Sequence, residues 1–217
     1  MSKAKPFWTS FSKIALDWVY PPQCALCTRI GTPAVCEVCA SEMTPLPTLY
    51  EERLDDVLSF RLSVYSYDGR AGQAVRRLKY SRATSLAGFM ADAIKTMACE
   101  ADLMDGRIVA PVPIHWRRRA SRGFNQAELL CGSFPRPSVR KDLLIRTRPT
   151  SPQAGLSADQ RRRNLTGAFR VQGRVDGQRI LLVDDVLTTG QTGRECGRVL
   201  LEAGAIEVGL VTFAAEL

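Results

Sequence analysis

The sequence predicts an α/β fold in which helices flank a parallel β-sheet, with a small four-cysteine module in front of it. Residues 180–183, Ile-Leu-Leu-Val, form an uninterrupted run of β-prone apolar residues, as expected of a strand buried on both faces of such a sheet. A helix pattern follows at once: apolar residues recur with helical spacing from Cys196 to Ala203, and Gly204 can end the helix. Two Cys-x-x-Cys pairs near the N-terminus indicate a separate metal-binding unit.

Length, composition and charge fit one domain with a small appendage. The chain has 217 residues, of which 45% are hydrophobic and 24% charged, as is ordinary for a soluble globular protein. No apolar run approaches the length of a membrane span, and the N-terminus lacks the features of a signal peptide, so we expect a cytoplasmic protein. The net charge of +8 is unevenly spread, because residues 107–170 hold 14 basic and 3 acidic side chains. This excess predicts polyanionic ligands such as pyrophosphate or nucleic acid, with a solvated basic face as the alternative.

We expect three parts in the chain, at residues 1–20, 21–45 and 55–217. In residues 1–20 the pattern predicts a short amphipathic helix, which the two prolines that follow it would end. We expect its apolar stripe to dock on the protein itself rather than on a partner or a membrane. The stripe consists of Phe7, Phe11, Ile14 and Trp18.

The second part has the cysteine spacing of a metal-binding module. Its pattern is Cys24-x2-Cys27-x8-Cys36-x2-Cys39. Two such knuckles place four thiolates for tetrahedral coordination, which favours zinc; iron and disulfides are the rival interpretations, and a cytoplasmic setting argues against disulfides. Four thiolates leave no open coordination position, so the zinc would be structural. We expect loss of the module to leave ligand binding elsewhere in the chain intact.

The third part begins with a predicted strand and two helices. Residues 59–69 alternate polar and apolar side chains like a strand, and helical patterns follow at residues 71–80 and 86–99. We expect the basic side chains here to be surface charges, with the alternative that one or two face a phosphate or nucleic acid. These side chains are Arg76, Arg77, Lys79 and Arg82.

A second buried strand is expected at residues 107–114, with a basic loop beyond it. Its positive charge comes from Arg117, Arg118, Arg119 and Arg122. We expect Gly123 to open a helix with Asn125 and Gln126 in its first turn. The single histidine, His115, is expected to be exposed to solvent, with a direct role as the alternative.

Two aromatic residues border this basic loop. Trp116 and Phe124 are expected to be packed, and the alternative is that they stack on nucleobases. A long polar stretch at residues 146–169 predicts either a functional lid or disorder. Its helical part, with Ser157 as N-cap, would present three guanidinium groups to a phosphate or a nucleic-acid backbone. These groups belong to Arg161, Arg162 and Arg163.

The strand at residues 180–183 is followed by two carboxylates and a turn. Asp184 and Asp185 stand where the strand is expected to end, and residues 188–192 are mostly small or hydroxylated. Adjacent carboxylates can accept hydrogen bonds from a sugar diol, while turn amides at a helix N-terminus bind a phosphate. Ligands also bind at this edge of open α/β sheets. The combination predicts a binding site for a ribose 5-phosphate group.

The sequence DDVLTTGQT resembles the phosphoribosyl pyrophosphate (PRPP) loop of type I phosphoribosyltransferases. In that family the two acidic residues hold the ribose hydroxyls and the Thr/Gly run holds the 5-phosphate. The resemblance implies a catalytic role for the acidic pair and PRPP binding by the whole loop. The loop is Asp184, Asp185, Val186, Leu187, Thr188, Thr189, Gly190, Gln191 and Thr192.

Other segments extend the likeness. The strand ending in Pro-Val-Pro, with the arginine loop beyond it, resembles the pyrophosphate loop of amidophosphoribosyltransferases. Residues 146–169 resemble the flexible loop that closes over the reacting carbon in type I enzymes. With the four cysteines and the motif RGFNQAELL, these segments are similar to the competence protein ComF family from about residue 20 to residue 213.

The ComF resemblance implies a structural zinc module, PRPP bound with Mg²⁺ and a part in natural transformation. That part would be the handling of single-stranded DNA in the cytoplasm, beside a competence helicase and recombination proteins. The alternative is an active phosphoribosyltransferase that acts on a nucleobase or amine acceptor and has no role with DNA. No residue of the sequence identifies the acceptor.

Overall fold

The computed structural model describes residues 21–47, 56–148, 165 and 167–216. The helix expected within residues 1–20 and the three arginines Arg161, Arg162 and Arg163 lie outside the described residues. Within the described part of the chain, no helix is long and apolar enough to cross a bilayer.

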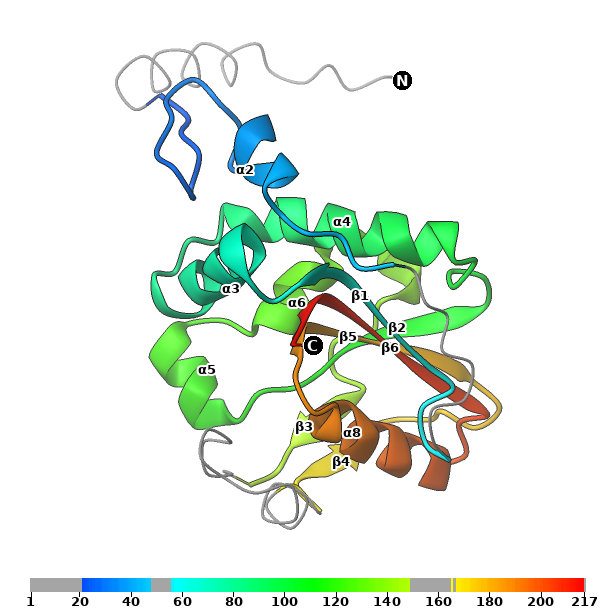
Figure 1. Ribbon diagram of the computed structural model, residues 1–217. Helices are drawn as coiled ribbons and strands as arrows, with labels where there is room; N and C mark the ends of the chain where they lie inside the picture. The colour runs from blue at the N-terminus through cyan, green and yellow to red at the C-terminus, as the bar shows by residue number, and fades with distance from the viewer. Residues whose placement is uncertain (1–20, 48–55, 149–164, 166, 217) are drawn as a thin grey trace, which may run out of the picture.

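A four-stranded, all-parallel sheet forms the centre of the molecule (Figure 1). Its strands are β1 (Phe60–Ser66), β2 (Arg107–Pro111), β5 (Arg179–Leu187) and β6 (Glu207–Ala215), in the order β1-β6-β5-β2. The parallel sheet expected from the sequence is confirmed. A short antiparallel pair, β3 (Leu144–Arg146) and β4 (Phe169–Val171), lies beside it.

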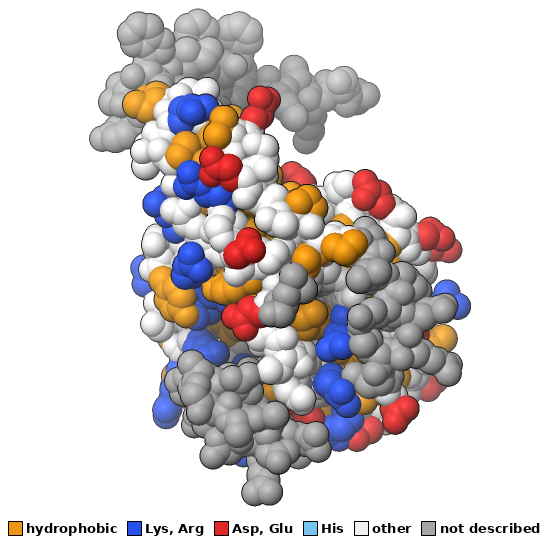
Figure 2. Space-filling model, in the orientation of Figure 1, with side chains coloured by type: hydrophobic (Ala, Val, Ile, Leu, Met, Phe, Trp, Pro, Cys, Tyr) orange, Lys and Arg blue, Asp and Glu red, His pale blue; other side chains and the backbone are white. Residues whose placement is uncertain are grey.

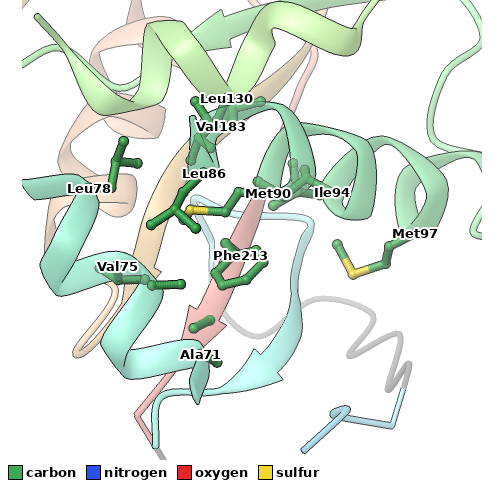
Figure 3. Packing of buried hydrophobic residues seen from close by; sticks show 14 of the residues in the cluster. Ala71, Val75, Leu78, Leu86, Met90, Ile94, Met97, Leu130, Val183 and Phe213 are labelled. Atoms are coloured by element: carbon green, nitrogen blue, oxygen red, sulfur yellow. The ribbon is translucent and has the colours of Figure 1, made fainter. Parts of the chain in front are cut away.

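Helices cover both faces of the sheet. On one face lie α3 (Gly69–Tyr80), α4 (Leu86–Glu100) and α6 (Gln126–Leu130), and on the other lies α8 (Gln191–Glu202). Figure 3 shows side chains of α3, α4 and α6 pointing toward Val183 of β5 and Phe213 of β6. Successive side chains of a strand point to opposite faces of the sheet, so β5 contributes to the hydrophobic core on each face. Leu181 and Val183 face α3 and α4, whereas Ile180 and Leu182 face α8.

The cysteine module shares the core on the α3 side. Cys24, Cys36 and Cys39 belong to the same hydrophobic cluster as Val75 of α3 and Met90 of α4. This module contains the short helix α2 (Glu37–Ser41). Polar contacts reinforce the apolar ones: the guanidinium of Arg77 donates to the carbonyl of Ala25, and Arg70 pairs with Glu42 at 2.6 Å.

Three local expectations were wrong. The strand does not end before the carboxylates, because the ladder between β5 and β6 continues through Asp184↔Thr212 to Leu187↔Ala215. The basic stretch is not a loop but the helix α5 (Trp116–Arg122), and Gly123 ends this helix instead of opening the next one. Its φ of 87° lies in the left-handed region that suits a helix C-terminus. The next helix, α6, begins at Gln126, with Asn125 as its N-cap.

Candidate functional site

A pocket of about 540 Å³ opens where the carboxyl ends of β2, β5 and β6 meet. Parallel strands bring these ends to the same edge of the sheet, so the residues that follow them converge. Asp184, Asp185 and Val186 come from β5, Val112 follows β2, and Glu216 follows β6. The pocket therefore lies at the edge that the sequence predicted.

The two carboxylates enter the pocket from opposite faces of β5. Asp185 lies on the α3 side, is 6% exposed and forms an ion pair of 2.9 Å with Lys79. Asp184 shares its face with Ile180 and Leu182, and its Oδ1 accepts a hydrogen bond of 2.8 Å from the backbone N–H of Asp185. Neighbouring residues of identical type are thus placed in different electrostatic environments.

These environments set the charge of the pair. Burial raises the pKa of Asp184 to about 7, with a further rise from the adjacent charge of Asp185. For Lys79, burial lowers the pKa, but the attraction of Asp185 outweighs it and the net shift is upward. The ammonium of Lys79 therefore stays charged beside Asp185, while Asp184 can gain a proton near neutral pH.

The turn after β5 brings the N-terminus of a helix to the pocket. Gly190 adopts a φ of 72° at the N-cap of α8, and a Cβ there would lie 2.8 Å from Nη1 of Arg61. The left-handed φ favours glycine at this position, whereas the Arg61 guanidinium ends a flexible side chain that could shift. The 12-residue helix α8 directs its N-terminus to the pocket edge, where Thr188 and Thr192 line the wall. The remaining turn residues are not in the wall; they are Leu187, Thr189, Gly190 and Gln191.

The structure separates the four predicted arginines into two pairs. Arg118 and Arg122 are half-buried and line the pocket. Arg119 is exposed and pairs with Glu128 at 2.5 Å, and Arg117 is exposed with its guanidinium 5.4 Å from the centre of the Trp116 ring. Helical spacing explains the division, since residues four apart share one face of α5.

Several pocket residues were not predicted as site residues. The polar ones among them are Tyr67, Lys79, Tyr80, Gln126, Arg146 and Glu216. They come from elements distant in sequence, so only the fold brings them together. Two signals were present: the basic run in α3, which contains Lys79, and the motif RGFNQ, which contains Gln126.

A smaller hollow of about 350 Å³ adjoins the pocket on the α3–α5 side. Both spaces are lined by Lys79, Tyr80, Arg118 and Arg122. Arg82 and Ser121 complete the hollow, and none of the described residues that line it is a carboxylate. Tyr80 is 73% exposed, with the guanidinium of Arg122 5.5 Å from its ring centre. Figure 2 shows Lys and Arg side chains along the left of the face it presents, the side on which α3 and α5 lie in Figure 1.

Three expectations about the basic segment can be compared with the structure. Trp116 is 64% exposed, so the expectation that it is packed was wrong; it lies on the solvent side at the start of α5. Phe124 is partly buried against the core of the α3 side, as expected. The expectation that His115 is exposed was wrong: its ring is buried at the N-cap of α5, where Nδ1 accepts a hydrogen bond from the N–H of Arg117. Burial and the nearby arginines lower the pKa of His115.

The four N-terminal cysteines form a structural zinc site. Their Sγ atoms lie within 4.8 Å of one another, and tetrahedral Zn–S bonds of about 2.3 Å place sulfurs ~3.8 Å apart. Backbone N–H groups of Leu26 and Cys36 point to Sγ of Cys24 at 3.4 Å, an arrangement that stabilises a thiolate. All seven cysteines are free of disulfides.

Comparisons with known proteins agree with this organisation. A family model described as "Phosphoribosyl transferase domain" matches residues 136–217, and one described as "Double zinc ribbon domain" matches residues 15–50. The DNA utilization protein YhgH of Escherichia coli is 33% identical over 196 residues, which cover 84% of this chain and 81% of that protein. Competence protein ComFC of Bacillus subtilis is 30% identical over 185 residues, which cover 83% and 72%.

A third relative, competence protein F of Haemophilus influenzae, is 37% identical over 107 residues, or 46% of each chain. The matches with YhgH and ComFC extend over most of this chain and most of each relative. The chain belongs to the competence protein ComF family, in which a structural zinc ribbon precedes a phosphoribosyltransferase-like domain.

Proposed function

We propose that the pocket at the carboxyl ends of β2, β5 and β6 binds PRPP together with Mg²⁺. The observation that carries the proposal is the convergence, within one pocket of about 540 Å³, of a carboxylate pair, two threonines at the N-terminal end of α8 and several cationic side chains. Asp184 and Asp185 would hold the ribose hydroxyls, and residues 188–192 the 5-phosphate. Arg118, Arg122 and Lys79 would face the pyrophosphate.

The chemistry that such an arrangement can support is phosphoribosyl transfer. The bond between the anomeric carbon and the pyrophosphate oxygen breaks, an acceptor forms a new bond to that carbon, and the pyrophosphate leaves with the electron pair. Positioning and charge stabilisation of an oxocarbenium-like transition state would supply the rate enhancement. Mg²⁺, when bound, would neutralise charge on the pyrophosphate. The alternative within this proposal is turnover on a nucleobase or amine without any role with DNA.

A calorimetric titration of Mg²⁺ and PRPP into the whole chain tests the proposal. We expect the wild type to bind and an Asp184→Ala/Asp185→Ala variant to lose binding. Arg119→Ala is the control, because Arg119 is an exposed cation of α5 that pairs with Glu128 and does not line the pocket. Absence of binding by the wild type, or equal binding by the double variant, would refute the assignment.

Handling of single-stranded DNA in the cytoplasm, beside a competence helicase and recombination proteins, is the second part of the proposal. Its support is the hollow next to the pocket, where the described lining combines an exposed aromatic ring with four cations and has no carboxylate. Aromatic side chains stack on bases and cations follow the phosphate backbone, without a requirement for sequence. The cavity beside Trp116 is a poorer candidate, since Glu128 and Asp142 line it.

Fluorescence anisotropy with a labelled oligothymidylate at several salt concentrations tests this second part. Tyr80→Ala should weaken binding by about tenfold, from the loss of one stacked base. Replacement of Arg161, Arg162 and Arg163 by Ala should reduce the salt dependence. Trp116→Ala is the control that should retain binding. If the Tyr80→Ala variant bound the oligonucleotide with full affinity, the hollow would not be part of the DNA-binding surface.

A further inference from the structure

We infer that Gln126 is a ligand-binding residue that donates a hydrogen bond from Nε2 to a pyrophosphate oxygen. The inference deepens the proposed function and rests on it. Gln126 is 1% exposed, forms part of the pocket wall, and its Nε2 has no hydrogen-bond partner among the described residues. Buried polar groups are nearly always paired, so such a donor needs an explanation.

The neighbouring residue of the same motif shows the contrast. Asn125 uses its side chain within the protein: Nδ2 donates to the carbonyl of Val112 at 3.1 Å, and Oδ1 accepts from the N–H of Ala127 at 3.1 Å. These two bonds attach the start of α6 to the end of β2 and fix the backbone at Gln126. The Gln126 side chain is therefore placed by a rigid support, while its own donor is left for another partner.

The position in the fold identifies the group that would accept this bond. Gln126 begins α6, whose Leu130 packs on the same face of the sheet as Val183, the face that carries α3. The phosphate-binding turn leads instead into α8 on the opposite face. The same pocket wall carries the cations Lys79 of α3 and Arg118 and Arg122 of α5.

A cationic wall of this kind suits the negatively charged pyrophosphate rather than the sugar. The amide group has a broad, roughly two-fold torsion, so it can turn its donor to an oxygen that the cations hold. Lys79 is already paired with Asp185, so a neutral donor adds a directed hydrogen bond without further repulsion among the cations.

The test separates affinity from stability. In Gln126→Met, which keeps the length of the side chain but removes the amide, we expect binding of inorganic pyrophosphate with Mg²⁺ to weaken by about 10-fold to 100-fold. Binding of ribose 5-phosphate should be unchanged. The melting temperature of the free protein should stay equal or rise, because a buried donor without a partner is removed.

Two further variants complete the experiment. Gln126→Glu keeps the shape and adds a negative charge, so it should weaken pyrophosphate binding at least as much. Gln172→Met makes the same chemical change at an exposed glutamine outside the pocket and should change neither quantity.

Each other outcome contradicts the inference in a recognisable way. Unchanged pyrophosphate affinity in Gln126→Met refutes it while PRPP binding stands. A lower melting temperature shows that the amide is satisfied within the protein, and an equal loss for ribose 5-phosphate shows a general change of the pocket. Failure of the wild type to bind PRPP, pyrophosphate and ribose 5-phosphate overturns the proposed function together with this inference.

Discussion

Replacing each of the two adjacent carboxylates by its amide should change stability in opposite directions. In the folded protein the pKa of Asp184 is about 7, against an ordinary value of 3.8. Because the pKa of Asp184 is higher in the folded than in the unfolded protein, the folded state binds the proton more tightly. The stability that this gives is fully present below about pH 4 and is lost as the pH rises to about 7. Ionised Asp184 therefore destabilises the fold at neutral and higher pH.

The magnitude follows from the size of the shift. Three pKa units correspond to about 4 kcal/mol at 1.36 kcal/mol per unit. The Asp184 side chain keeps some contact with solvent, so we reduce this to about 2 kcal/mol. Asp184→Asn should raise the melting temperature by about 6 °C at pH 8 and have no effect at pH 4. The Asn Oδ1 can still accept the hydrogen bond from the N–H of residue 185.

Asp185→Asn is the matched comparison. It removes the partner of Lys79, whose side chain is only 21% exposed, and leaves an ammonium unpaired. Removal of one member of a buried pair should cost about 3 kcal/mol at neutral pH. Thermal unfolding of both variants from pH 4 to pH 8 provides the measurement. A destabilised Asp184→Asn at pH 8, or a stabilisation of the same size at every pH, would show that burial of Asp184 does not carry this cost.

Three other predictions concern the pocket, the zinc module and the sheet. Arg118→Ala and Arg122→Ala should each weaken Mg²⁺-pyrophosphate binding by about tenfold, whereas Arg117→Ala and Arg119→Ala should change it less than about twofold; calorimetry would contradict this if all four behaved alike. Removal of zinc by a chelator, or Cys24→Ser, should weaken PRPP binding by roughly fivefold. The reason is that α3 links the two parts: Arg77 contacts the cysteine module, and Lys79, two residues later, pairs with Asp185 in the pocket. Equal affinity with and without zinc would show that the two parts are independent. Gly209→Ala should destabilise the protein by about 3 kcal/mol, since the added Cβ would lie 2.0 Å from the buried Phe60 ring. Adding Phe60→Leu to the same chain should restore part of the lost stability, as measured by urea unfolding.

The zinc prediction differs from the one made from the sequence. Two Cys-x-x-Cys pairs indicate a metal site by local spacing alone, and spacing suggests a unit that can be lost by itself. The shared core of Cys24, Cys36 and Cys39 with α3 and α4 depends on long-range packing, which local spacing does not encode.

Local patterns predicted the framework of the sheet and part of the pocket. The apolar run before Asp184 specifies a buried strand, and the residues after it supply Thr188 and Thr192 of the pocket wall, because both features rest on neighbouring residues. The end of β5 was misplaced, since its last pairs depend on β6, which follows later in the chain. Lys79, Arg146 and Gln126 reach the pocket from three separate elements, so their convergence becomes visible only once the topology is known.

The position of β6 has a consequence for synthesis of the chain. β6 lies between β1 and β5 in the sheet, yet it is the last of the described strands to be made. Until residues 207–215 emerge from the ribosome, β1 lacks its neighbour, and the apolar side chains of Phe60 and Leu62 have no finished sheet to cover them. Nascent chains that stall before this point would expose unpaired strand edges, which favour aggregation and recruit chaperones.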